Sequence, residues 1–399
     1  MVIRKLIWFA FAFAVKILFL DAGIAQAYPE FIGYGYATCM NCHYNGLGSG
    51  PLTDYGRALW SSDIASRALY PKSMTDEQIA AQSGFLGAFE LPDWIRPHLK
   101  YRGLELRTQP GSASQDTTKY YHMQADMGAT LQDKLGKYVA VMTWGRMVPP
   151  NQYGSATDGL DRFLAREYYL RAQLAETWWI YVGLMEKAFG LRNIDHTSYQ
   201  RTYQGFNVAN NDSNGIAQSQ GVVVQKETEH WNLFLNYFIG NPYDDPQFKQ
   251  RGFSATGEFD IGENKRLGAS ILSARSDVLT KQIAAIHYRQ QVSIGSSLMA
   301  EYGLIQGQDA SSNISVGSYN LIEALVRVVR GYNIRLGVER YNKEFHTSVP
   351  ENWKYSVGLL MFPAPRFEFR VEAVDERAIS TQTTTDDNWA LEGQVHVSL

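Results

Sequence analysis

The chain has 399 residues, a formal net charge of −3 and two cysteines. This length can bury a sizeable core. The nearly balanced charge, without a basic block, argues against a nucleic-acid partner, and two cysteines exclude a disulfide framework.

The first 27 residues predict a secretory signal peptide. Arg4 and Lys5 form a positive start, Leu6 to Leu20 is an apolar run, and Ala25-Gln26-Ala27 is a small-x-small cleavage site. The alternative, a retained membrane anchor, normally needs a longer apolar run. We therefore expect residues 1–27 to be removed from an exported protein.

Both cysteines fall in the pentapeptide Cys39-Met40-Asn41-Cys42-His43, the Cys-x-x-Cys-His attachment signature for c-type haem. Two thiols at this spacing can reach the vinyl groups of one macrocycle, and His43 is then placed to be the proximal ligand of the iron. Two alternatives stay open. A thiol–disulfide redox site normally follows a strand in a βαβ setting, and none is visible here. A zinc site would need a fourth ligand. The motif thus predicts one covalent haem c on Cys39, Cys42 and His43.

Residues 28–95, the N-terminal segment, are expected to form a small, mainly helical haem-binding unit. Thr53 to Trp60 is predicted to be a short helix that shields one haem edge. Arg57 on this helix is a candidate partner for a haem propionate, or else an ordinary surface arginine. A second helix is expected to start at Thr75, because Thr75-x-x-Gln78 forms a capping box. So small a unit would be poorly stabilised without its cofactor.

From residue 96 to residue 399, apolar and polar residues alternate with the period of a β-strand. This pattern predicts an all-β transmembrane barrel of about 16 antiparallel strands, mostly of about 9–13 residues, close to the length that crosses a membrane. The strands are expected near 98–107, 121–131, 137–147, 165–175, 177–187, 219–226, 230–239, 252–261, 265–275, 279–289, 292–305, 315–329, 331–342, 354–363, 366–376 and 388–399.

The connections between these strands alternate between tight turns and mostly longer polar segments, as periplasmic turns and external loops do. A soluble sheet can also have one polar face but rarely sustains this asymmetry. We therefore expect a bacterial outer-membrane protein surrounded by lipid. The even strand number puts both chain ends on the periplasmic side.

The second axial ligand of the iron has three main candidates, and His287 on the tenth predicted strand is a weaker one. Met74 is the only methionine of the N-terminal segment outside the motif. His98 begins the first predicted strand and His396 lies near the end of the last one. These strands become neighbours when the barrel closes, and the alternation turns both histidines inward. We rank His98 above Met74 and His396, because a ligand on the barrel wall would also fasten the N-terminal segment into the lumen.

The order of signal peptide, single haem motif and barrel resembles the fused monohaem cytochrome–porins of the outer membrane, whose best-known members are proposed iron oxidases. The resemblance rests on Tyr28–Phe31, on Cys39, Cys42 and His43, and on Pro51–Arg57, where those oxidases have a similar proline–leucine and aromatic–Gly–Arg sequence. A glycine-rich stretch before Pro51 departs from their pattern. The resemblance implies ferrous iron as an extracellular electron donor and a periplasmic cytochrome or other redox carrier as a second partner.

Electron transfer across the outer membrane is accordingly the leading hypothesis, since a single haem suits one-electron exchange. A porin whose haem is structural or sensory is the main alternative, and haem-catalysed chemistry on a molecule such as peroxide is a third. The sequence predicts no catalytic residue, and it leaves open whether iron(II) oxidation is an enzymatic activity of this chain.

Overall fold

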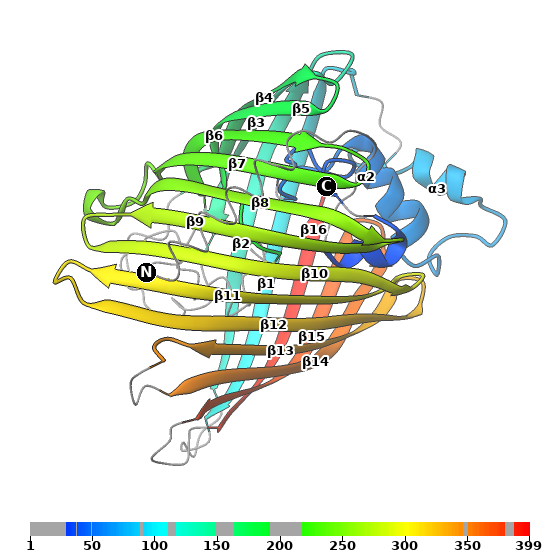
Figure 1. Cartoon of the computed structure of the whole chain (residues 1–399). Helices are drawn as coiled ribbons and strands as arrows, with labels where there is room; N and C mark the ends of the chain where they lie inside the picture. The colour runs from blue at the N-terminus through cyan, green and yellow to red at the C-terminus, as the bar shows by residue number, and fades with distance from the viewer. Residues whose placement is uncertain are drawn as a thin grey trace.

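The computed structural model describes residues 29–36, 38–48, 50–87, 91–110, 117–147, 163–191, 218–345, 350–379 and 387–399. Sixteen antiparallel strands close into a barrel in which each strand pairs with its neighbours in sequence and β1 pairs with β16 (Figure 1). Their bounds are β1 Ile95–Pro110, β2 Thr117–Gln132, β3 Tyr138–Met147, β4 Leu164–Ala175, β5 Trp178–Glu186, β6 Gln218–Glu227, β7 Trp231–Gly240, β8 Arg251–Gly262, β9 Lys265–Arg275, β10 Leu279–Ser293, β11 Ser296–Asp309, β12 Ile314–Val329, β13 Tyr332–Asn342, β14 Glu351–Ala364, β15 Phe367–Ile379 and β16 Asp387–Ser398. The predicted fold class and strand number are confirmed, whereas the predicted signal peptide lies outside the described residues.

The predicted turn between β10 and β11 is wrong by four residues. The sequence suggested strands at 279–289 and 292–305, but β10 continues to Ser293 and β11 begins at Ser296. Gly295 occupies the turn with a φ of 80°, a backbone conformation that a glycine adopts at little cost. The glycine therefore sets the hairpin position, and the apolar alternation runs on past the expected turn.

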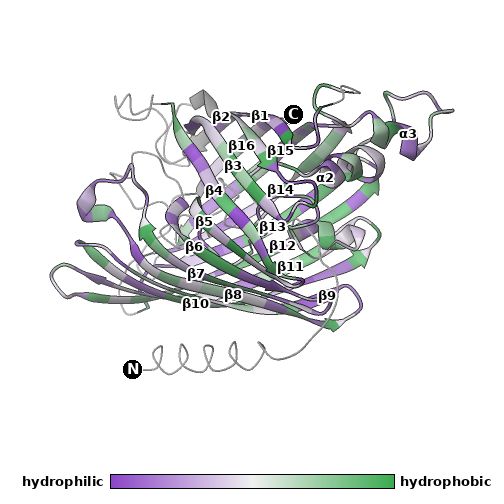
Figure 2. Ribbon diagram, turned by 90° about the horizontal axis from the view of Figure 1, so that it is seen from above, coloured by the Kyte–Doolittle hydropathy of each residue, from purple (hydrophilic) through white to green (hydrophobic). Residues whose placement is uncertain are grey.

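The barrel exposes apolar side chains on its outside and buries charged ones inside. Leu99 and Tyr101 of β1 are 39% and 43% exposed, while His98, which precedes Leu99, is 4% exposed. Figure 2 shows the same alternation of hydrophobic and hydrophilic residues along the strands. Other exposed apolar residues are Met127, Met142, Leu170, Val182, Ile286, Ile322, Leu336, Val357, Val371 and Leu391. An apolar exterior of this extent is not stable in water and matches the lipid-facing band of an outer-membrane barrel, so the protein resides in the outer membrane.

Charged side chains on the inward face of the strands pair with one another in the lumen. Arg335 of β13 lies 2.7 Å from Glu372 of β15 and 2.6 Å from Glu323 of β12. Arg166 of β4 lies 3.3 Å from Asp126 of β2. Buried charges are tolerated when they are paired in this way, so the lumen is polar but closely filled.

One end of the barrel carries tight turns and both ends of the barrel sequence. The β8–β9 and β14–β15 turns each contain a residue at positive φ, Asn264 at 51° and Arg366 at 73°. At the same end, the Leu99 amide donates to the Leu399 carbonyl at 3.0 Å. In outer-membrane barrels the short-turn end faces the periplasm.

The N-terminal segment contains a 3-10 helix η1 (Pro29–Tyr34), α2 (Asp54–Leu59), a π-helical turn η2 (Trp60–Ile64) and α3 (Asp76–Ala81). The predicted helix at Thr53 is confirmed, because the Thr53 hydroxyl caps α2 by accepting from the Gly56 amide at 3.0 Å. The predicted capping box of Thr75 and Gln78 is present at the start of α3. A further 3-10 turn, η4 (Pro246–Phe248), lies between β7 and β8. In the described part of the chain, no helix has the length and apolarity needed to cross a membrane.

The N-terminal segment lies in the lumen at the short-turn end, with α2 beside the strand ends in Figure 1 and α3 projecting beyond them. Its hydrogen bonds reach the wall on several sides. They join Asn45 to Glu167 on β4, Thr38 to Glu227 on β6, Gly33 to Gln291 on β10 and Ser66 to Phe362 on β14. The segment therefore forms a plug that is fastened around the circumference of the barrel.

Candidate haem site

The Cys-x-x-Cys-His motif forms a single helical turn inside the plug. The amides of Cys42 and His43 both donate to the Cys39 carbonyl, at 3.2 and 2.9 Å. His43 then forms an isolated antiparallel bridge with Leu52, and the Thr53 amide donates to the Cys42 carbonyl at 2.8 Å. The start of α2 is thus fixed directly to the motif.

Two glycines allow the chain to pass close to the cysteines. Gly48 has a φ of 87°, and a Cβ there would lie 2.8 Å from the Cys39 sulfur. At Gly56 of α2, a Cβ would lie 2.3 Å from the Cys42 carbonyl oxygen. Contacts this short are forbidden to a side chain, so Gly56 in the aromatic–Gly–Arg sequence is what lets α2 pack on the motif.

Both thiols have a raised pKa. Burial raises the pKa of Cys39 to about 12, where the charges of Arg289 and Glu258 also act, and burial raises the pKa of Cys42 to about 12. Thiols that exchange disulfides have a lowered pKa, because the thiolate is the nucleophile. This environment therefore disfavours the thiol–disulfide alternative. In the described part of the chain, no group of three or more His, Cys, Asp or Glu is arranged to hold a metal ion.

A cavity lies between the motif and the barrel wall. From the plug it is lined by Cys42, His43 and Trp60, among others. The wall contributes Lys100, Arg102, Arg335, Glu368, Arg370 and His396. Side chains of the plug and of the barrel wall therefore line one cavity.

The side-chain nitrogens Nε2 of His396, Nε of Arg102 and Nε1 of Trp60 are buried at this cavity and have no hydrogen-bond partner within the described part of the chain. Buried polar atoms in folded proteins are nearly always paired, so three orphans around one cavity need an explanation. An imidazole nitrogen suits a metal ion, and two N–H donors suit a carboxylate. The residues therefore fit a haem, whose iron and propionates offer both partners.

The sequence matches no family model and no curated protein. The fold, however, is similar to solved structures. OprB of Pseudomonas putida has a TM-score of 0.58 at 12% identity and covers 77% of this chain and 94% of its own. OmpT of Vibrio cholerae has a TM-score of 0.56 at 10% identity, covering 77% and 99%. The outer-membrane channel DcaP of Acinetobacter baumannii has a TM-score of 0.55 at 11% identity, covering 78% and 99%. The chain has the porin fold. These similarities concern the barrel and carry no information on haem.

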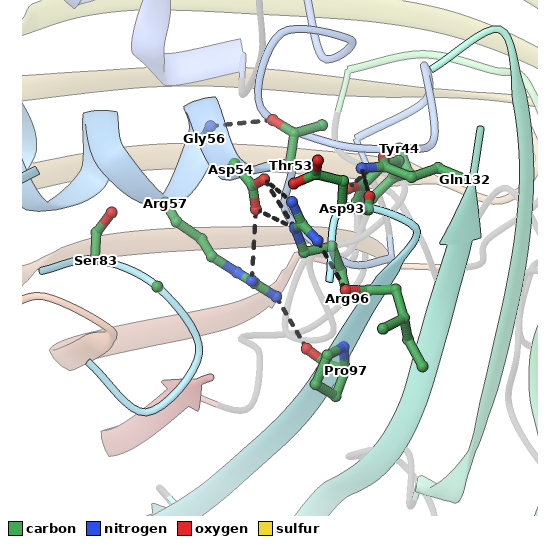
Figure 3. Close-up of polar contacts among 12 residues, drawn as sticks. Tyr44, Thr53, Asp54, Gly56, Arg57, Ser83, Asp93, Arg96, Pro97 and Gln132 are labelled. Carbon is green, nitrogen blue, oxygen red and sulfur yellow. Dashed lines mark hydrogen bonds and ion pairs between the residues drawn. The ribbon is translucent and has the colours of Figure 1, made fainter. Parts of the chain in front are cut away.

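Within the barrel, Arg57 joins α2 to β1. Its Nη2 donates to the Pro97 carbonyl at 3.1 Å and its Nη1 lies 3.9 Å from Asp54 (Figure 3). Asp54 is also held by Arg96, whose Nε lies 2.8 Å from a carboxylate oxygen. Arg57 is not among the described residues that line the cavity. Arg102 is accordingly better placed to meet a propionate there.

The three candidates for the second axial ligand lie in different places. His98 points inward, as expected, but its Nε2 lies 2.9 Å from the Thr143 hydroxyl. Met74 precedes α3, where its carbonyl accepts from Arg67. Neither residue belongs to the described lining of the cavity, whereas His396 and His43 both do. The structure thus places His396, rather than the first-ranked His98, on the cavity that contains His43.

Arg102 and Glu368 lie on inward-facing strand positions, but strand alternation by itself does not link them to the motif. Both stand directly opposite His396, Arg102 on β1 and Glu368 on β15. Trp60 was expected only to shield a haem edge, and its ring centroid lies 6.4 Å from that of His396. The sequence did offer one signal for these neighbours of His396. The first strand begins and the last strand ends at the short-turn mouth, so residues near the two ends of the barrel sequence lie close together there.

Proposed function

We propose that the protein transfers electrons across the outer membrane through one covalent haem c, as in a fused cytochrome–porin. Cys39 and Cys42 would hold it by thioether bonds, and His43 would ligate its iron. When bound, this group supplies one-electron redox chemistry. The observation that carries the proposal is the position of the Cys-x-x-Cys-His motif, which borders a cavity where His396, Arg102 and Trp60 have orphan nitrogens.

The plug supports electron transfer more than free diffusion of solutes. Its hydrogen bonds to β4, β6, β10 and β14 place folded chain across the short-turn end of the lumen. A periplasmic redox carrier can approach this end. Burial of the motif keeps water from it, which lets the surrounding groups rather than solvent set the potential.

A second cavity supports an approach from the other side. It borders Cys39 and extends past Glu186, the long-connection end of β5, to Leu191. Its lining includes Glu186, Glu258 and His287 together with the cations Lys187 and Arg289, and Arg289 pairs with Glu258. An extracellular donor in this cavity would lie beside one edge of the proposed haem.

A channel whose haem is structural or sensory is the second candidate function. The similarity of the fold to porins, including a structure described as an anion-selective porin from Comamonas acidovorans, favours it. The two functions differ in conductance. A plugged electron conduit should pass few ions in a planar bilayer, whereas a porin should show large, steady openings.

The experiment that tests the haem is removal of both thiols. The double variant Cys39→Ala with Cys42→Ala should lose all covalent haem, seen as the loss of the haem-stained band on a denaturing gel. His43→Ala should keep some attached haem with a disturbed spectrum. Met40→Leu is the matched control, since it changes the motif at an intervening position and should leave attachment intact. Covalent haem in the double variant would refute the proposal.

A further inference from the structure

We propose that His396, positioned by Glu368, is the second axial ligand of the haem iron and thereby joins the last barrel strand to the plug. This inference rests on the proposed haem function and names the group that completes its site. It assigns to Glu368 the role of a positioning residue, which acts on the iron only through the imidazole.

His396 lies on the barrel wall at the edge of the cavity. The residue lies on β16, is 4% exposed and lines the cavity that also contains His43. Its Nδ1 lies 3.1 Å from an oxygen of Glu368, and its Nε2 is buried without a hydrogen-bond partner in the described part of the chain. One ring nitrogen is therefore engaged by the wall, and the other is left for a ligand in the cavity.

His396 and Glu368 form a pair whose chemistry suits binding of a metal by the imidazole. A carboxylate that accepts a hydrogen bond from Nδ1–H fixes the tautomer in which Nε2 has its lone pair available. Histidines that ligate metals almost always donate their other N–H to a carboxylate, a carbonyl or water in this way. The contact between His396 and Glu368 has this arrangement. His287 has a similar contact, with its Nε2 3.3 Å from Glu258, but it lines the cavity beside Cys39 rather than the one that contains His43.

The register of the neighbouring strands fixes His396 in place. Glu368 of β15 and Arg102 of β1 both stand opposite His396 in the hydrogen-bonded ladder. The imidazole is thus held by the seam at which the barrel closes. By contrast, His98 is four residues from Arg102 along β1, about 13 Å at the rise of a strand, and its Nε2 already contacts Thr143.

Spectroscopy of the purified protein tests the assignment directly. The wild type should show low-spin iron with two imidazole ligands by electron paramagnetic resonance, and no methionine–iron charge-transfer band. His396→Gly should keep the covalent haem but become high-spin, and free imidazole should restore the low-spin spectrum. His98→Gly, a matched buried histidine of the wall, should remain low-spin.

The outcomes separate this inference from the proposed function. Absence of covalent haem from the wild type would refute the haem itself. With haem present, a methionine–iron band, or a His396→Gly protein that stays low-spin without imidazole, would overturn the ligand assignment. Faster migration of unheated samples on a gel checks that each barrel has folded. If the glycine variant does not fold, His396→Met takes its place and should give the methionine–iron charge-transfer band that the wild type lacks.

A redox titration tests Glu368. Glu368→Gln should keep the low-spin spectrum but raise the midpoint potential, because an amide makes the imidazole a weaker donor to the iron than a carboxylate does. Asp260→Asn is the control, since Asp260 lies 3.4 Å from His230, a different histidine–carboxylate pair that is not part of the cavity lining. An unchanged potential in Glu368→Gln would refute its positioning role.

Discussion

Gly56 determines how closely α2 approaches the haem motif, and two opposed effects meet at this residue. Alanine is favoured over glycine in a helix by about 0.8–1 kcal/mol. A Cβ at this position, however, would lie 2.3 Å from the carbonyl oxygen and 2.7 Å from the Cα of Cys42. Both atoms belong to the backbone, so no side-chain rotation can relieve the overlap. Overpacking of this kind costs about 1–3 kcal/mol or more, and we expect it to outweigh the gain in helix propensity.

Gly56→Ala should therefore displace α2 from the motif and reduce the yield of attached haem, despite the better helix former. The measurement is the ratio of haem stain to protein, together with the temperature at which the visible absorption changes. Gly262→Ala is the control, because its Cβ would meet only the flexible Lys265 side chain at 3.6 Å. A Gly56→Ala protein with full haem content and higher thermal stability would contradict this account of the packing.

At the scale of elements, Arg330 in the β12–β13 turn anchors η2 and α3 to the barrel. Its Nε donates to the Ala65 carbonyl at 2.8 Å, its Nη2 to the Ser61 carbonyl at 3.2 Å and its Nη1 to Asp76 at 2.9 Å. Guanidinium groups can make several fixed hydrogen bonds at once, which lysine cannot. The Arg330 side chain therefore holds η2 and α3, two of the helical elements of the plug, near the short-turn mouth.

Arg330→Gln should loosen the plug and increase ion conductance in a planar bilayer relative to the wild type, whose conductance should be low. Faster hydrogen exchange in residues 60–81 should accompany this change. Lys134→Gln, a charge removal in the exposed β2–β3 turn, provides the comparison and should change neither quantity. If the wild type is already open and the Arg330 variant conducts equally, the channel function would be favoured instead.

At the scale of the whole molecule, the even number of strands places the N-terminal segment and Leu399 at the same end. The short turns lie at this end, and the longer connections lie at the other. Because lipid surrounds the exterior, the barrel has only two aqueous faces. The orientation of the protein in the membrane therefore decides which redox partner meets the plug.

Cysteine labelling of intact cells tests this orientation. An impermeant maleimide should label Asn211→Cys and Thr384→Cys, both outside the described residues and in connections expected on the cell surface. It should label Gly262→Cys and Ala364→Cys, at the short-turn end, only after the outer membrane is permeabilised. The opposite pattern would mean that the barrel is inverted.

The sequence by itself determined the features that depend on neighbours along the chain. The haem motif, the capping box at Thr75 and the alternation of each strand are set by spacings of a few residues. The number of strands followed from these local patterns and from the connections between them. The contacts of Arg57 could not be predicted from its neighbours along the chain, because its partners include Pro97 on β1.

The tertiary structure alone decided which distant residues share the cavity. His43 and His396 come from opposite ends of the chain, and their meeting depends on the depth of the plug and on the β1–β16 register. Alternation predicts that a side chain points inward but not its height along the barrel. That height is set by hydrogen-bonded pairing between strands and by packing against the plug, which is why His98 ranked first by sequence although His396 is the histidine that shares a cavity with His43.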